Sequence, residues 1–242
     1  MKKHLSVFML FVRSTIYKVL GILVLMCGLE FLLFNRAMTR AQSEGMPGLE
    51  WVVEKSWMIF VFLAAELCIF TILISDISRK KSKTQYTLSR LRINEHCMFF
   101  WQAASHMSTF AFAFAVQTIF AFMLCQYYVQ TSGDTTITQH TIFLAFYRSD
   151  FLHSLVPFDE MASIAGNFVV VFTLGLSSAL ASFTARYNRG AFSGFIGGYT
   201  SFCFIRRGTG DFGGNLLIFF LAAVVIAYAI YFLFIKEARH DI

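Results

Sequence analysis

The chain has 242 residues, of which 57% are hydrophobic and only 14% are charged. A water-soluble domain carries about a quarter of its residues as Asp, Glu, Lys and Arg, so this composition excludes an ordinary soluble domain. The formal net charge is +6, but we do not expect a nucleic-acid partner, because the basic residues lie mainly beside apolar segments, where they face solvent or lipid headgroups.

Six apolar segments follow one another along the chain. Each meets or approaches the roughly 20 residues that a helix needs to cross the hydrocarbon core of a bilayer. They lie near 16–36, 57–76, 99–129, 161–185, 190–205 and 213–235. We therefore predict an all-α, polytopic membrane protein with six transmembrane helices, in which residues 1–242 form a single transmembrane domain.

The distribution of basic residues predicts the orientation. With the N-terminus inside, most of the 20 Lys and Arg residues fall on the cytoplasmic side, including the run at 79–92. Basic residues are retained preferentially on that side. We expect both termini in the cytoplasm and the protein in the cell (plasma) membrane.

The first residues, 1–18, have amphipathic spacing. Leu5, Phe8, Val12 and Ile16 recur at helical intervals, with Arg13 between them. This spacing predicts an interfacial helix on the inner membrane surface, ahead of the first span.

Two outer connections differ in length. The one at about 37–56 is short, and Trp51 and Trp57 near its end are placed as membrane-interface anchors. The one at 130–160 is longer and contains apolar runs that are too short to span. We predict an interfacial or re-entrant helix in this extracellular loop.

The inner loop at 77–98 is hydrophilic and basic. Ser82 and Gln85 have the spacing of a capping box, so a helix can begin there. Leu88 and Leu91 would share one face of it. The sequence predicts a short amphipathic helix beneath the membrane that a partner can hold; the alternative is a solvated basic connector.

Sequence signatures of catalysis are missing. The chain has no G-x-x-x-x-G-K-[ST] phosphate loop and no H-E-x-x-H zinc motif. Ser193-Gly194 resembles the nucleophile motif of intramembrane serine proteases only in part, because Ala191 stands where that motif has its first glycine. We therefore expect no catalytic residue, metal or cofactor in this chain.

Polar residues inside the predicted spans are candidates for function. Glu30 and Glu66 lie within the first and second spans, where a charged carboxylate costs on the order of 2.5–3.5 kcal/mol. Their possible hydrogen-bond partners are His106, Gln117 and Asn167. These residues predict either a polar translocation path or groups that hold helices together, with a carboxyl group that burial keeps protonated as a further alternative.

The fifth span contains small residues at four-residue intervals. Gly194 and Gly198 form one such pair, and Ser193 and Gly197 form another. Small residues let helix backbones approach closely, so this span is predicted to pack against a neighbour in this chain or in a second copy.

These features together resemble a known family. Six spans, an amphipathic start and a basic loop with Tyr86-Thr-Leu-Ser-Arg-Leu91 before a long third span are similar to the membrane subunit of an ABC-2 type transporter. The proline often present in that loop is absent here. Many members also place their extracellular re-entrant segment between the fifth and sixth helices, whereas the long outer loop here is 130–160.

The resemblance implies a set of partners. In that family the loop between the second and third spans is a coupling helix that docks into a separate ATPase. The docking surface would comprise Tyr86, Thr87, Leu88, Arg90, Leu91, Arg92 and Glu95. Two ATP-binding subunits, which hold ATP and Mg, would act with two membrane subunits, either two copies of this chain or a related pair.

The function that we expect is therefore ATP-driven export of a lipophilic or amphipathic substrate such as a peptide, lipid or drug. Two alternatives stay open. One is an ion-coupled carrier that uses Glu30 and Glu66. The other is a non-transporting scaffold or sensor that holds a partner through the same inner loop.

Overall fold

The computed structural model describes residues 2–43, 48–78, 95–131, 139–158, 161–186, 192–205 and 212–232. In these ranges all regular secondary structure is helical. The helices are α1 (Lys2–Ser43), α2 (Leu49–Lys55), α3 (Met58–Ser78), α5 (Glu95–Thr131), α6 (Gln139–Arg148), α7 (Asp150–Leu155), α8 (Met161–Arg186), α9 (Phe192–Ile205) and α10 (Phe212–Ile230).

Five of the described helices are long and apolar enough to cross a membrane: α1, α3, α5, α8 and α10. The chain is accordingly a multi-pass membrane protein. The predicted spans near 57–76, 99–129 and 161–185 correspond closely to α3, α5 and α8.

The predicted fifth span, 190–205, corresponds to α9. This helix has 14 residues, about 21 Å at 1.5 Å per residue, which is less than the roughly 30 Å of the hydrocarbon core. Residues 187–191 and 206–211, which flank it, lie outside the described part of the chain. That α9 crosses the membrane therefore stays a prediction.

The start of the chain differs from expectation. We predicted a surface helix over 1–18, separate from the first span, but α1 is one continuous helix of 42 residues. No proline interrupts this range, and extending an existing helix is cheaper than nucleating a second one. At about 63 Å, α1 is far longer than the membrane is thick, and it takes in part of the connection expected at 37–56.

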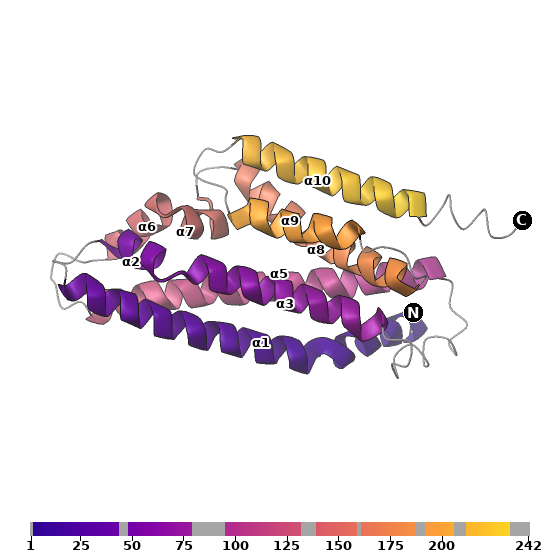
Figure 1. The fold of residues 1–242 in the computed structure, drawn as a ribbon, viewed down its shortest axis with the longest axis horizontal. Helices are drawn as coiled ribbons and strands as arrows, with labels where there is room; N and C mark the ends of the chain where they lie inside the picture. Colours follow the sequence, from indigo (N-terminus) through magenta and orange to yellow (C-terminus); the bar gives the residue numbers. More distant parts are fainter. Residues whose placement is uncertain are drawn as a thin grey trace, which may run out of the picture.

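The helices form an elongated bundle in which α8 is central (Figure 1). It packs against α3, α5, α9 and α10, and α1 packs against α3 and α5. In the most apolar 18-residue stretch of α8, 72% is buried inside the protein, whereas the corresponding stretches of the other four long helices are 22–39% buried. The start of α1 and the end of α10 lie at one end of the bundle, where α3 ends and α5 begins (Figure 1).

The opposite end of the bundle carries short helices. The predicted outer loop at 130–160 contains α6 and α7, which pack against each other, and α6 also packs against α2. An ion pair of 3.2 Å between Arg148 of α6 and Glu50 of α2 joins them. Both partners are partly exposed, so this pair contributes at most about 1 kcal/mol.

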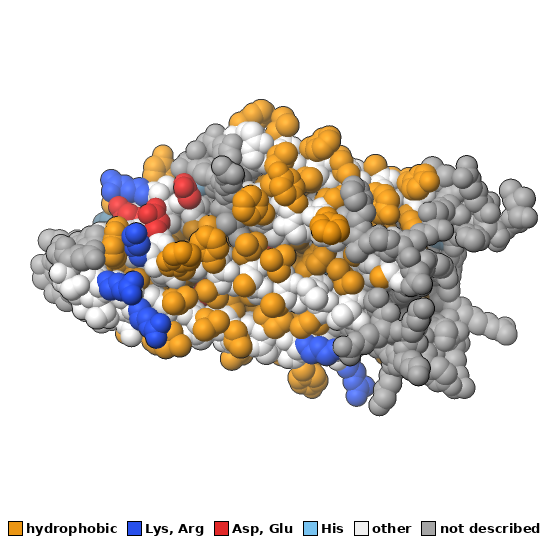
Figure 2. Space-filling view, viewed as in Figure 1, with side chains coloured by type: hydrophobic (Ala, Val, Ile, Leu, Met, Phe, Trp, Pro, Cys, Tyr) orange, Lys and Arg blue, Asp and Glu red, His pale blue; other side chains and the backbone are white. Residues whose placement is uncertain are grey.

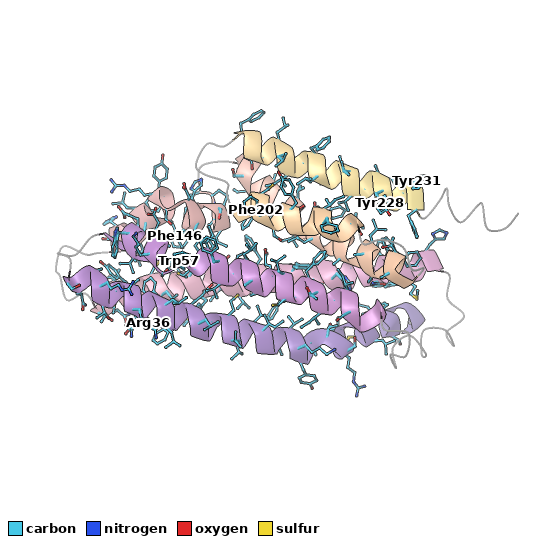
Figure 3. All side chains as sticks on the ribbon, viewed as in Figure 1. Arg36, Trp57, Phe146, Phe202, Tyr228 and Tyr231 are labelled. Atoms are coloured by element: carbon cyan, nitrogen blue, oxygen red, sulfur yellow. The ribbon has the colours of Figure 1, made fainter. Side chains whose placement is uncertain are left out.

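The surface of the bundle fits a bilayer. Figure 2 shows hydrophobic side chains along its middle, acidic and basic side chains at the end formed by α2 and α6, and further basic side chains toward the opposite end. In Figure 3, Arg36 and Trp57 lie toward that end, whereas Tyr228 and Tyr231 lie at the other end on α10. Trp, Tyr and basic residues are typical of the two membrane interfaces.

Candidate functional site: buried polar groups within the spans

The spacing of charges on α1 places the polar groups at membrane depth. Lys18 and Arg36 are both exposed, and 18 helical positions separate them by about 27 Å, close to the thickness of the hydrocarbon core. Glu30 is the only Asp, Glu, Lys or Arg residue between them. Its side chain has no exposed surface, so α1 presents no charge to lipid over this distance.

Glu30 pairs with Gln117, one of the three possible partners named from the sequence. The Gln117 side-chain amide of α5 donates to Glu30 Oε2 over 3.1 Å. Both side chains are completely buried. Glu30 Oε1 and Gln117 Oε1 are buried without a hydrogen-bond partner among the described residues. The pair therefore ties α1 to α5 and retains unused acceptor capacity.

Glu66 has a different partner from those predicted. It lies eight positions, about 12 Å, from the start of the 21-residue α3, and its side chain is buried. Its carboxyl group is hydrogen-bonded to the Ser201 side chain of α9. The other oxygen, Oε2, has no partner in the described residues. Ser201 escaped sequence analysis because a serine near a helix end carries no distinguishing pattern.

His106 lies on the line of contact between α5 and α8. His106 Nδ1 lies 2.9 Å from Ser178 Oγ. Ser178 Oγ itself donates to the Gly175 carbonyl over 2.9 Å, so its proton is engaged and the imidazole acts as the donor from Nδ1. The side-chain partner of His106 that the structure shows is Ser178, which was not among the residues named from the sequence.

A second polar pair continues this contact. The Gln102 side-chain amide donates to Ser182 Oγ, and Ser182 Oγ donates to the Ala179 carbonyl over 2.8 Å. Gln102 precedes His106 by four residues, and Ser182 follows Ser178 by four. Positions four apart share one helix face, so the two pairs are successive rungs between antiparallel helices.

The backbones meet closely one step further along. A Cβ atom on Gly175 would lie 2.7 Å from the Met107 Cα atom and 2.4 Å from its Cγ atom. Such distances leave no room for any side chain at this position. We call this contact the α5–α8 seam, defined by Gln102, His106, Met107, Gly175, Ser178 and Ser182. Sequence analysis missed it, although Gly175 and Ala179, and Ser178 and Ser182, have the four-residue spacing of small residues that marks such contacts.

Asn167 serves a short helix and does not face the carboxylates. Its side-chain amide donates to the carbonyls of Ser154 and Leu155, over 3.0 and 3.2 Å. These are the last two residues of α7, whose terminal carbonyls have no partner within the helix. Asn167 therefore fixes α7 onto α8, which favours the packing interpretation of this residue.

The small residues of α9 divide into close and open positions. A Cβ atom on Gly197 would lie 2.6 Å from both the Phe70 ring and Ser177 Oγ, so this glycine lets α9 approach α3 and α8. Gly198 is open, with Leu67 Cδ2 as its nearest neighbour at 3.9 Å.

The other two positions of the motif are less constrained. Gly194 is half-buried. Ser193 is fully buried, and its hydroxyl has no hydrogen-bond partner among the described residues. The close neighbours of α9 that the structure does show belong to this chain.

The predicted docking surface cannot be placed. Tyr86, Thr87, Leu88, Arg90, Leu91 and Arg92 lie outside the described residues, and Glu95 is described only as the first residue of α5. Among the described residues no three His, Cys, Asp or Glu side chains lie close enough to hold a metal ion.

The arrangement as a whole is a set of separate polar contacts. Each lies between two helices at membrane depth, and together they connect α1, α3, α5, α8 and α9. Comparison of the chain with known protein families, curated proteins and solved structures gives no match.

Proposed function

We propose that this chain is the membrane-spanning permease subunit of an ATP-driven transporter of the ABC-2 type. The observation that carries the proposal is the position of the helix ends that flank the basic inner loop. Ser78 of α3 and Glu95 of α5 lie at the end of the bundle where α1 begins and α10 ends (Figure 1). A segment so placed can be reached by a partner on one side of the membrane.

The orientation and the sixth span belong to this proposal. With α9 as a crossing helix, the number of crossings is even and both termini share one side. The excess of basic residues in 79–92 and at both termini makes that side the cytoplasm. The membrane is then the cell membrane.

ATP hydrolysis takes place in partner subunits. Two ATPases bind ATP and Mg and close on each other, and each pushes the inner loop of one of two membrane subunits. Because the loop connects directly to α3 and α5, its displacement is passed to the helices that carry Glu66 and Gln117. This chain contributes no catalytic residue and no cofactor of its own.

The cargo is lipophilic or amphipathic and leaves the cell. In support of this, the described spans present phenylalanine and leucine to their surroundings, while the polar groups are few and lie between helices. A hydrophilic cargo would require a continuous polar lining, which separate pairs do not supply. Peptides, lipids and drugs are the classes of substrate that fit.

The docking surface is tested by reversing its polarity. Leu88→Asp or Leu91→Asp places a carboxylate in an apolar contact, so we expect loss of ATPase association and of ATP-dependent transport, with membrane insertion unchanged. Ser89→Asp is the matched control, because it adds the same charge to the adjacent position on another face of the predicted helix. Association is measured by co-purification in mild detergent, and transport in proteoliposomes.

The outcome that contradicts the assignment is equally definite. If Leu88→Asp and Leu91→Asp retain full association and transport, the inner loop is not the docking surface. Accessibility mapping that places 79–95 on the outer face contradicts the orientation as well. Absence of both proton-driven and ATP-dependent transport favours a scaffold or sensor that holds a partner through the same loop.

A second candidate, an ion-coupled carrier, has one observation in its favour. Glu30 Oε1 and Glu66 Oε2 are buried carboxyl oxygens without a partner among the described residues, as a group that takes up and releases a proton requires. In this case a proton gradient alone drives transport, and Glu66→Gln abolishes it. Under the permease proposal, transport needs ATP and a co-purified ATPase.

A further inference from the structure

An apolar groove runs between α1 and α3 on the outer surface of the bundle. Its volume is about 730 Å³. α1 contributes a stripe at helical spacing that includes Gly21, Leu25, Leu29 and Leu33, and the stripe begins with Lys18. Leu25 and Leu29 are 63% and 43% exposed, so the groove is open toward the lipid.

The facing wall comes from the first turns of α3. Trp57, Phe60 and Ala64 line it. The Trp57 ring lies 5.1 Å from the Phe60 ring, measured between centroids, and both side chains are largely exposed. Trp57 has a φ of 57°, a left-handed backbone that a bulky residue adopts only at a cost of order 1–3 kcal/mol. The turn between α2 and α3 thus holds this indole at the end of the groove despite strain.

We propose that this groove binds one anionic phospholipid, with an acyl chain along the groove and the headgroup phosphate on Lys18. Lys18 carries the only charged side chain in the lining. It is also the residue that marks one boundary of the hydrocarbon core on α1, about 27 Å from Arg36. A phosphate lies at that depth, and an ammonium group has three donors for it.

The length of the groove suits an acyl chain. From Lys18 to Leu33 the groove follows 15 helical positions, about 22 Å, which exceeds the roughly 15 Å of one leaflet. The lipid acyl chain can therefore lie along the protein past the bilayer midplane. Gly21 supplies the floor near the headgroup, because a Cβ atom there would meet nothing within 4 Å.

Native mass spectrometry of the purified protein tests the site. The probes are palmitoyl-oleoyl phosphatidylglycerol and phosphatidylcholine with the same chains. We expect one retained phosphatidylglycerol, preferred about fivefold, the factor that corresponds to the ~1 kcal/mol of one basic residue at an anionic lipid surface. Lys18→Ala removes the preference, and Lys18→Arg keeps it. Millimolar inorganic phosphate does not displace the lipid.

Blocking the groove tests the acyl chain separately. Gly21→Leu puts a side chain into the floor, where its Cβ atom meets no protein atom within 4 Å, so retention of both lipids falls. Gly28→Leu is the matched control: it also faces open space, two turns along α1, but does not line the groove. Ala64→Phe blocks the groove from α3 and gives the same loss if Gly21→Leu does not fold.

Three results overturn the proposal. The first is an unchanged lipid preference in Lys18→Ala. The second is lipid retention in both Gly21→Leu and Ala64→Phe, or an equal loss in Gly28→Leu. The third is a change of oligomeric mass in Gly21→Leu with lipid retention unchanged, which would make the groove an interface with a second copy. None of these measurements depends on an ATPase partner or on transport.

Discussion

The α5–α8 seam and the two glutamates are both polar and buried, but their hydrogen bonds are built differently. In the seam, Ser178 and Ser182 each donate to a carbonyl of their own helix and accept from α5. Both roles of each hydroxyl are filled. Glu30 and Glu66 each have one partnered oxygen and one without a partner among the described residues.

The difference separates structural from functional polarity. The His106–Ser178 pair, in which both roles of the hydroxyl are filled, holds two helices together. The Gln102–Ser182 pair does the same, although Gln102 Oε1 is buried without a partner among the described residues. A carboxyl group with an open oxygen is costly to bury, and it retains the capacity to take another partner. We therefore assign His106 to helix packing and keep Glu30 and Glu66 as the candidates for a role in the transport that we propose.

The largest effect should come from the close backbone contact in the seam. Gly175→Leu drives a side chain into the backbone of Met107. Overpacking typically costs about 1–3 kcal/mol of stability, occasionally more, and we expect the loss here to reach or exceed the upper end of that range. We expect little monodisperse protein after purification. Gly28→Leu carries the same substitution into open space and should purify as wild type. Equal yields of the two variants would show that α5 and α8 do not approach as described.

A smaller loss should follow when a glutamate loses its donor. Gln117→Leu leaves the Glu30 carboxyl group buried without its hydrogen bond, at a cost of about 1–3 kcal/mol. Replacing both partners, Glu30→Leu with Gln117→Leu, removes the unsatisfied group, so the double variant should be more stable than Gln117→Leu alone. Unfolding by SDS in mixed micelles measures each free energy.

This cycle also has a definite contrary result. If the effects of Glu30→Leu and Gln117→Leu simply add, the two side chains are not coupled. The Glu30–Gln117 hydrogen bond would then be of no energetic consequence, and the contrast with the seam would fail.

Much of this fold was predictable because bilayer thickness imposes a length on each apolar segment. The positions of α3, α5 and α8 follow from composition alone. The high cost of burying a carboxylate predicted a polar partner for Glu30, and Gln117 was one of three candidates named for the two glutamates. The continuity of α1 could not be predicted in this way, because the amphipathic spacing at 5–16 is the same for a helix on the membrane surface and for one that continues into the membrane.

The seam was missed for a related reason. Gly, Ser and Ala spaced by four occur in both α8 and α9, and sequence alone does not say which helix has a partner close enough to need them. The structure places a backbone contact at Gly175 and a close side-chain contact at Gly197, while Gly198 of the predicted motif is open. The partner of Glu66 was hidden too, since Ser201 is one of many serines near helix ends.

The smallest effect distinguishes two buried serines. Ser178→Ala removes the acceptor of His106, and hydrogen bonds between membrane helices average about 0.6 kcal/mol, so we expect a loss of that order. Ser193 is equally buried, but its hydroxyl has no partner among the described residues. Ser193→Ala removes an unsatisfied polar group and should leave stability unchanged or raise it. The same SDS titration measures the free energy of unfolding of both variants. A larger loss of stability in Ser193→Ala than in Ser178→Ala would mean that burial alone, without the bond to α5, decides what a serine contributes to this bundle.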